Sequence, residues 1–168
     1  MTNHSVKIDS FSFMRRSRIF AIQALFQFEF YDSNKPIDTI ISELYDIYKE
    51  DFAESDIKKI INTELIEKLI DTAIKQKKEI FNIFSPFLNQ NWQAEDISLN
   101  LNIILRLASA EIINTTTDLP IIINEYIEIT KVYESSKEAR FINSILEQIG
   151  TTTRKNTKKT SLSPSQVK

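Results

Sequence analysis

The sequence predicts an all-α protein built from two packed helical halves. Apolar residues recur at spacings of three and four along most of the 168-residue chain, and no segment shows the period of two that marks a strand. The chain contains a single glycine, which disfavours β-rich folds and phosphate-binding loops because both need glycine in tight turns. Pro36, Pro86 and Pro120 interrupt the helical pattern and divide the helices into two groups.

The N-terminal half is expected to span about residues 14–88, after a flexible leader over residues 1–13. Its apolar periodicity predicts three helices, over residues 14–31, 37–48 and 56–84. The polar sequence from Asp32 to Pro36 forms a turn after the first helix, and a charged loop follows the second. Pro86 ends the third helix, since proline lacks an amide donor and disfavours helix in the residue before it.

The C-terminal half is expected to span about residues 97–150. Three helices are predicted there, over residues 99–113, 119–133 and 136–149. The first has the widest apolar surface and is therefore expected to be central. Pro120 fits the first turn of the second, and Ser135 with Glu138 forms a capping box before the third. Gly150 follows the last apolar position, which predicts a left-handed C-cap.

Residues 151–168 differ in composition from the rest and are expected to form a disordered basic tail. This segment is rich in Thr, Ser and Lys and has no acidic residue. Its cations are Arg154, Lys155, Lys158, Lys159 and Lys168. Because the whole chain has a net charge of −2, residues 14–150 form a net acidic body.

The composition excludes several classes of function. The chain has no cysteine and one histidine, His4, so thiolate zinc sites, imidazole metal clusters and histidine-activated nucleophiles are not possible. The leader lacks the pattern of a signal peptide, and the longest apolar stretch is interrupted by Gln23, Gln27 and Glu29. We therefore expect a cytoplasmic protein that is not an enzyme and has no metal, cofactor or membrane partner.

Arginine is the residue type that points to a ligand. Three of the six arginines, Arg15, Arg16 and Arg18, lie within four residues at the start of the first helix. The helix dipole disfavours cations there unless acids are near, and the local sequence offers only Asp9. At about 100° per residue, all three side chains are expected along one edge of the helix. Guanidinium groups suit phosphate, so two interpretations stay open: binding of a phosphate backbone, or a solvated or ion-paired helix end.

Further cations lie in the C-terminal half. Lys137 and Arg140 flank the start of the last helix beside Phe141, whose ring either stacks on an unpaired base or belongs to the core. Arg106 lies inside the most apolar helix, where an internal ion pair with a carboxylate such as Glu125 is expected.

Four segments resemble the NusB transcription antitermination factors, which are all-helical RNA-binding proteins of bacteria. They are Arg15-Arg16-Ser17-Arg18 with the following AIQALF, ILRLA with Glu111, the LP and INEYIE sequences of residues 119–128, and FINSIL of residues 141–146. Their order and spacing hold from about residue 14 to residue 149. The chain departs from the family pattern at Phe26 and Ala110, which replace tyrosines, at Ser144, which replaces glycine, and at Asn102, where relatives often have a charged residue.

The resemblance implies a specific function. It implies binding of the single-stranded boxA element of nascent ribosomal RNA together with a small-subunit ribosomal protein, NusE, within an RNA polymerase antitermination complex. Carried over by position, the RNA-binding residues are Arg15, Arg16 and Arg18, and in a second tier Lys137, Arg140 and Phe141. The candidates for the protein partner are Phe26, Leu101 and Asn102. Phe26 has no hydroxyl, so it offers that partner an apolar contact.

Two other functions stay open. The same fold resembles the N-terminal domain of certain ribosomal RNA cytosine methyltransferases, so the chain could be a stand-alone ribosomal RNA-recognition domain, with no methyltransferase expected after residue 150. The second alternative is a helical protein-interaction module without a nucleic-acid role, in which the clustered arginines pair with acids of a protein.

Overall fold

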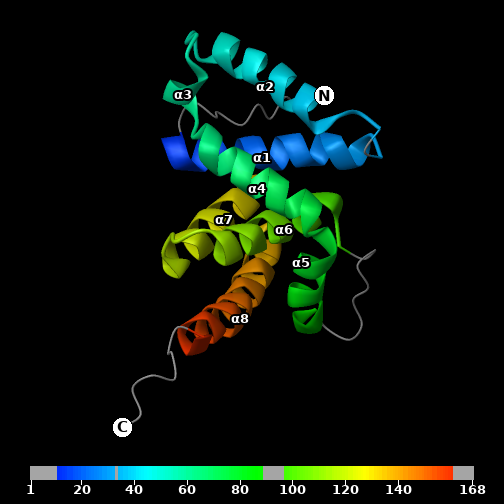
Figure 1. Cartoon of the computed structure of the whole chain (residues 1–168), viewed down its shortest axis with the longest axis vertical. Helices are drawn as coiled ribbons and strands as arrows, with labels where there is room; N and C mark the ends of the chain where they lie inside the picture. Colours follow the sequence, from blue (N-terminus) through cyan, green and yellow to red (C-terminus); the bar gives the residue numbers. More distant parts are fainter. Residues whose placement is uncertain (1–10, 33, 89–96, 161–168) are drawn as a thin grey trace.

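The computed structural model describes residues 11–32, 34–88 and 97–160, and these residues form helices without any strand (Figure 1). The helices are α1 (Phe13–Phe30), α2 (Ile37–Asp51), α3 (Ile57–Ile60), α4 (Thr63–Lys75), α5 (Lys77–Phe84), α6 (Leu99–Asn114), α7 (Leu119–Tyr133) and α8 (Ser136–Thr160), with a 3-10 turn, η2 (Ser85–Phe87), after α5. The predicted all-α class is confirmed. The predicted leader up to residue 10 and the predicted tail beyond residue 160 lie outside the described residues.

Two helices organise the packing. In Figure 1, α2 and α3 lie on one side of α1, and α5, α6, α7 and α8 lie on the other. α1 packs against α2, α4, α6 and α7, whereas α6 packs against α1, α4, α5, α7 and α8. Eleven of the 16 residues of α6 are buried, which is typical of a helix enclosed on all sides, so the predicted central position of this helix is confirmed. No helix in the described part is long and apolar enough to cross a membrane.

Side chains cap several helix starts. Ser12 accepts a hydrogen bond from the Arg15 amide of α1, and Ser98 accepts one from the Leu101 amide of α6. At α8, the Glu138 carboxylate accepts the Ser135 amide at 3.1 Å, and the Ser135 hydroxyl accepts the Lys137 amide at 3.2 Å. These contacts confirm the predicted capping box. Pro120 lies in the first turn of α7, also as predicted.

The prediction of one helix over residues 56–84 is wrong, because this segment forms α3, α4 and α5. Ile61 is extended between α3 and α4, with φ −142° and ψ 158°. The Asn62 side chain accepts the Leu65 amide at 3.0 Å, while the Asn62 amide donates to the Ser17 hydroxyl of α1 at 2.7 Å. Asparagine competes with the helix for backbone donors, so a capping residue fixed by a tertiary contact divides an otherwise continuous apolar pattern.

The predicted left-handed C-cap at Gly150 is wrong as well, because α8 continues through Gly150 to Thr160. Among the described residues no glycine has a positive φ. A Cβ atom at position 150 would lie 2.4 Å from Cδ2 of Leu119, so the glycine is needed for the close approach of α8 to the start of α7.

Residues 151–160 are therefore helical, and the tail predicted from composition does not begin at residue 151. Arg154 holds this part of α8 against the preceding helices. Its guanidinium donates to the carbonyl oxygens of Ile112 at 3.2 Å and Thr117 at 2.7 Å. These carbonyls lie at the end of α6 and in the loop after it, where backbone acceptors lack helical partners. A long-range contact thus stabilises a helix that composition alone disfavours.

We expect Gly150→Val to lower the free energy of unfolding by about 1–3 kcal/mol, because the added methyl groups would overlap Leu119. Gly150→Ala should cost less, since the end of a leucine side chain can move and alanine favours helix by about 1 kcal/mol over glycine. Urea unfolding followed by circular dichroism measures both. Equal stability of the valine variant and the parent protein would contradict the close approach of α7 and α8.

Candidate nucleic-acid interface

Arg15 at the start of α1 is bound by a carboxylate from α7. Its Nε and Nη2 atoms each donate to an oxygen of Glu125 at 2.9 Å. The hydrogen bonds from Arg15 lower the pKa of Glu125 despite its partial burial. The Arg15 side chain is still 24% exposed. Glu125 is 110 residues away in sequence, so the residues near Arg15 in the sequence do not indicate this ion pair.

Arg18 points into the protein. It is 2% exposed, and its Nε and Nη2 atoms donate to the two oxygens of the fully buried Glu111 at 3.0 and 2.6 Å. The Tyr126 hydroxyl donates to Oε2 of Glu111 at 2.9 Å, and burial raises the pKa of this phenol well above its ordinary value. The expectation that all three arginines line one outer edge is wrong for Arg18. A rotation of about 60° from Arg15 is enough to carry a side chain from the rim to the core.

Arg16 is held by backbone carbonyls. It donates to the carbonyl oxygens of Ile60 at 3.0 Å and Phe11 at 2.9 Å. Its guanidinium carbon lies 5.0 Å from the centre of the Phe52 ring, within the range of a cation–π contact. In the described part of the chain Arg16 has no carboxylate partner. Arg15 and Arg18 thus form an ion-paired helix end, whereas Arg16 remains a half-buried cation without a counter-charge.

The second predicted group of cations lies on the surface. Lys137 and Arg140 are exposed on the first turns of α8, and Phe141 is half-buried against the core. Arg140 borders a recess between α7 and α8 that is also lined by Lys131 and Asn143. Lys131 was not predicted from the sequence, because a single lysine in the last turn of a helix is an ordinary feature. Lys131 pairs with Glu128 at 3.0 Å.

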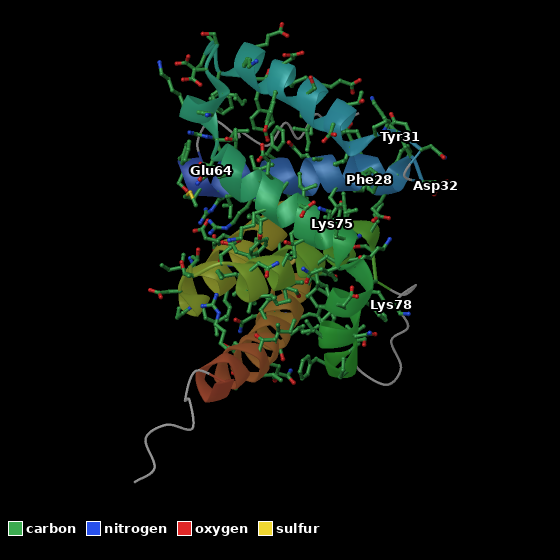
Figure 2. All side chains as sticks on the ribbon, in the orientation of Figure 1. Phe28, Tyr31, Asp32, Glu64, Lys75 and Lys78 are labelled. Atoms are coloured by element: carbon green, nitrogen blue, oxygen red, sulfur yellow. The ribbon has the colours of Figure 1, made fainter. Side chains whose placement is uncertain are left out.

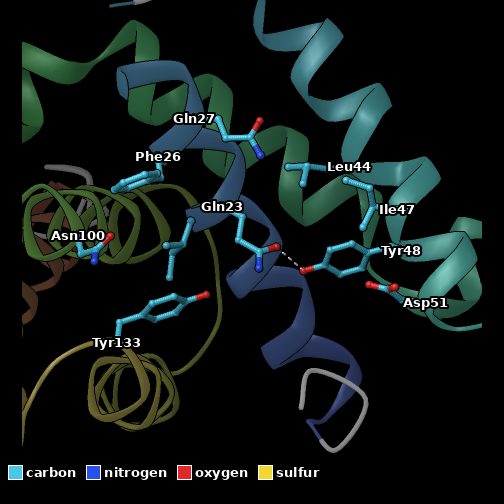
Figure 3. A pocket seen from close by; sticks show the side chains of 10 residues that line it. Gln23, Phe26, Gln27, Leu44, Ile47, Tyr48, Asp51, Asn100 and Tyr133 are labelled. Carbon is cyan, nitrogen blue, oxygen red and sulfur yellow. Dashed lines mark hydrogen bonds between the residues drawn. The ribbon is translucent and has the colours of Figure 1, made fainter. Parts of the chain in front are cut away.

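The residues predicted to bind a protein partner are separated in the structure. Phe26 lines a recess of about 380 Å³ between α1, α2, α6 and α7 (Figure 3), together with Ile47, Asn100 and Tyr133. Leu101 is 3% exposed and belongs to the core, so it is not a surface residue. Helical rotation turns Leu101 inward and leaves its neighbour Asn100 at the recess. Asn102 borders a different recess, between α5 and α6.

Arg106 forms an internal ion pair as expected, but with a different acid. Its Nη1 atom donates to Glu29 of α1 at 2.7 Å, and its Nη2 atom donates to the Ala73 carbonyl at 2.9 Å. Glu125, the suggested partner, binds Arg15 instead. Burial disfavours the charge of Glu29, but hydrogen bonds from Arg106 and Lys77 outweigh it and lower the pKa of this carboxyl. α1 is thus joined to the C-terminal half by ion pairs near both of its ends.

The predicted site residues that reach the surface include guanidinium and ammonium groups, those of Arg15, Lys137 and Arg140. Guanidinium and ammonium groups bind phosphate, and an aromatic ring can stack on a base. In the described ranges, no group of three or more His, Cys, Asp or Glu side chains could hold a metal ion. Two carboxyls at the ends of α1 have a lowered pKa: Glu29 near the end of α1, and Glu125 of α7, which lies beside the start of α1. Both are bound by cations of the same chain.

Comparison with known proteins identifies the family. The sequence profile of the NusB family matches residues 15–151. The chain belongs to the NusB family. The chain is 30% identical over 135 residues to the transcription antitermination protein NusB of Staphylococcus aureus strains JH9 and Newman, which covers 80% of this chain and 96% of the relative. A solved structure of T. maritima NusB superposes with a TM-score of 0.70 at 26% identity, over 86% of this chain and 96% of that one.

NusB membership confirms the resemblance that the four sequence segments indicated. The match ends at residue 151, so the last turns of α8 lie beyond the part shared with the family profile. The relatives are transcription antitermination proteins, and the family match over residues 15–151 spans both clusters of cations described above.

We expect Glu111→Gln to lower the free energy of unfolding by about 3–5 kcal/mol, because it removes the buried carboxylate that binds Arg18 directly and leaves only the longer contact with Glu125, at 3.8 Å. Tyr126→Phe should cost only about 1–2 kcal/mol, since it removes one hydrogen bond. Urea unfolding of both variants measures the difference. If Glu111→Gln does not fold, the double variant Arg18→Met with Glu111→Gln should restore folding; failure of both would contradict a charge imbalance as the cause.

The lowered pKa of Glu125 predicts a loss of stability in acid. A carboxyl whose pKa is lower in the folded state stabilises the fold above its ordinary pKa of 4.5, and this contribution disappears as the pH falls through the lowered value. Glu125→Gln should therefore reduce stability at pH 7 and lose less stability than the parent protein between pH 5 and pH 3. Thermal unfolding across this range is the measurement. Glu147→Gln, at an exposed residue in the middle of α8 without an ion pair in the described structure, is the control and should change stability far less than Glu125→Gln.

Proposed function

We propose that this NusB family member is a transcription antitermination factor that acts in the cytoplasm. In this proposal it binds the boxA element of nascent ribosomal RNA together with the ribosomal protein NusE, as part of an RNA polymerase antitermination complex. The observation that carries the proposal is family membership over residues 15–151, with curated antitermination proteins matched over 80% of the chain. The arrangement of cations and aromatic residues is compatible with this proposal and suggests where RNA and the protein partner would bind.

The proposed RNA surface runs along α7. Arg15 contacts Glu125 on one side of this helix, and Arg140 borders a recess with Ile127 on the other. Glu125 and Ile127 are two residues apart, so the two groups of cations flank the same turn of α7. The proposed direct contacts are the exposed part of Arg15, Arg16, Lys137, Arg140 and the ring of Phe141. Arg18 has a supporting role, since its Nη1 atom lies 3.8 Å from Oε2 of Glu125.

A protein partner is proposed to bind beside Phe26. The Phe26 and Phe30 rings stack with their centres 6.2 Å apart, and Phe30 is 66% exposed. Tyr31 is 47% exposed at the same end of α1. Exposed aromatic groups are enriched in protein interfaces. Because most of this chain is net acidic, a basic partner that extends the cationic surface would raise RNA affinity.

The exposed rings of Phe30 and Tyr31 favour the alternative of a protein-interaction module without an RNA role, because they offer an interface that needs no RNA. Arg15 and Arg18 already have carboxylate partners within the chain, so neither needs phosphate, or an acid of a partner, for charge balance. A stand-alone ribosomal RNA-recognition domain is the third possibility, and it would bind RNA without NusE. The three proposals differ in whether RNA is bound and in whether NusE is required.

The experiment is a fluorescence-anisotropy titration of labelled boxA-like RNA and a scrambled strand, with this protein alone and with NusE at fixed salt. The proposal expects tighter binding to boxA only when both proteins are present. Equal binding of boxA with and without NusE would favour the stand-alone domain. Weak binding that does not distinguish the two strands under any condition would favour the protein-interaction module.

The RNA surface predicts a specific loss on mutation. The double variant Lys137→Ala with Arg140→Ala should weaken boxA binding about tenfold and reduce the dependence of log Kd on log salt by about 1–2, because two phosphate contacts are lost. Its thermal stability should not change, since both residues are exposed. Lys75→Ala, an exposed cation on α4 paired with Asp71, is the matched control. An equal loss in the control would indicate nonspecific attraction only.

A further inference from the structure

A recess between α5 and α6 collects cations that the proposed RNA surface does not use. It has a volume of about 400 Å³, and its lining residues are Lys77, Lys78, Phe81, Asn102 and Arg106. Every charged side chain that lines it is positive. The carboxylate bound to these cations is that of Glu29, which accepts hydrogen bonds from both Arg106 and Lys77. With three cations and one carboxylate, the group has a net charge of +2 although the whole chain is net acidic.

Three donors at this recess have no acceptor in the described structure. Arg106 is 2% exposed, and its Nε atom is buried without a hydrogen-bond partner, whereas its two other nitrogens are bound. Lys78 is exposed and forms no ion pair with a described residue. The half-buried amide of Asn102 likewise has no hydrogen bond to the described residues. A buried donor without an acceptor costs free energy, and a negative charge bound beside the Arg106 guanidinium would offset part of that cost.

We propose that this recess binds a side-chain carboxylate of a protein partner. A carboxylate offers two oxygens, which matches the Asn102 amide on α6 and the Lys78 ammonium on α5, while the buried guanidinium of Arg106 adds positive charge beside them. The Phe81 ring forms an apolar wall of the recess. The site is therefore selective for an anion and takes one small enough to enter beside a phenyl ring.

The position of the recess favours a protein over RNA as the source of the anion. The ion pair of Lys77 with Glu29 places it at the C-terminal end of α1, and Figure 2 shows Lys78 on the same side of the molecule as Tyr31 and Asp32. Arg15 and Arg16 of the proposed RNA surface lie at the other end of α1, which is about 27 Å long for its 18 residues. The exposed aromatic rings of Phe30 and Tyr31 lie at the end near the recess. Aromatic groups beside a buried charge are typical of the energetic centre of a protein interface.

This inference rests on the proposed function only in requiring a protein partner. Its test needs no partner, since carboxylate binding can be measured on the isolated chain. The probe is N-acetylglutamate amide, which has one side-chain carboxylate, titrated into ¹⁵N-labelled full-length protein at low salt. Nuclear magnetic resonance would follow the Arg106 Nε–H signal and the Asn102 side-chain amide. A saturable shift of both signals is expected. Lys78→Gln should weaken binding about threefold, as for loss of one exposed ion pair, and Asn102→Ala should remove the saturable shift of the Arg106 signal.

Lys75→Gln is the matched control, because Lys75 is an exposed lysine two residues before α5 whose ammonium binds Asp71 at 2.7 Å. It should leave the affinity unchanged. A shift that does not saturate, or an equal loss in the Lys75 control, would overturn the site. Saturation by inorganic phosphate or a short single-stranded RNA, but not by the glutamate probe, would overturn the assignment to a carboxylate. A failure of boxA binding in the anisotropy experiment would leave these signals unaffected, so the two proposals fail independently.

Discussion

The buried ion pair between Arg18 and Glu111 is the constraint on which the arrangement of the helices depends. Arg18 comes from α1, Glu111 from α6, and Tyr126 of α7 donates to the same carboxylate. Charges this deeply buried are tolerated only when their hydrogen bonds are made, so a shift of any one helix would leave a polar group without a partner. The apolar contacts of α6 provide most of the burial, but they are not directional. The ion pair adds the geometric requirement that the apolar core lacks.

The ion pairs of α1 also determine which of its surfaces are available to ligands. Its first turns hold Arg15 against Glu125, with part of the side chain exposed, and its last turns hold Glu29 between Arg106 and Lys77. Between these two ends, most residues from Ser17 to Leu25 are buried. Cations are therefore exposed at one end of α1 and aromatic rings at the other. A helix fixed at both ends in this way can present two different surfaces at a constant separation.

Most of the helices were predictable from the sequence because their signals are local. The apolar periods, Pro120 and the Ser135–Glu138 capping box each act within a few residues, and each was observed where predicted. The failures have long-range causes. Asn62 divides a continuous pattern because Ser17 of α1 binds its amide, and Gly150 is helical because Leu119 approaches it and Arg154 binds carbonyls of another segment. No pattern within the segment itself reports such contacts.

The sequence by itself determined the class of the fold, the family and the residue types that could bind RNA. Only the tertiary structure decided which of those residues are available. Arg15 and Arg18 differ by three positions in the sequence, yet one is partly exposed and the other is enclosed with Glu111, 93 residues away. Leu101 and Asn100 are neighbours, and only Asn100 lines a surface recess. Periodicity gives the face of a helix, but the free energy of a charged side chain depends on the partner that another helix brings to it.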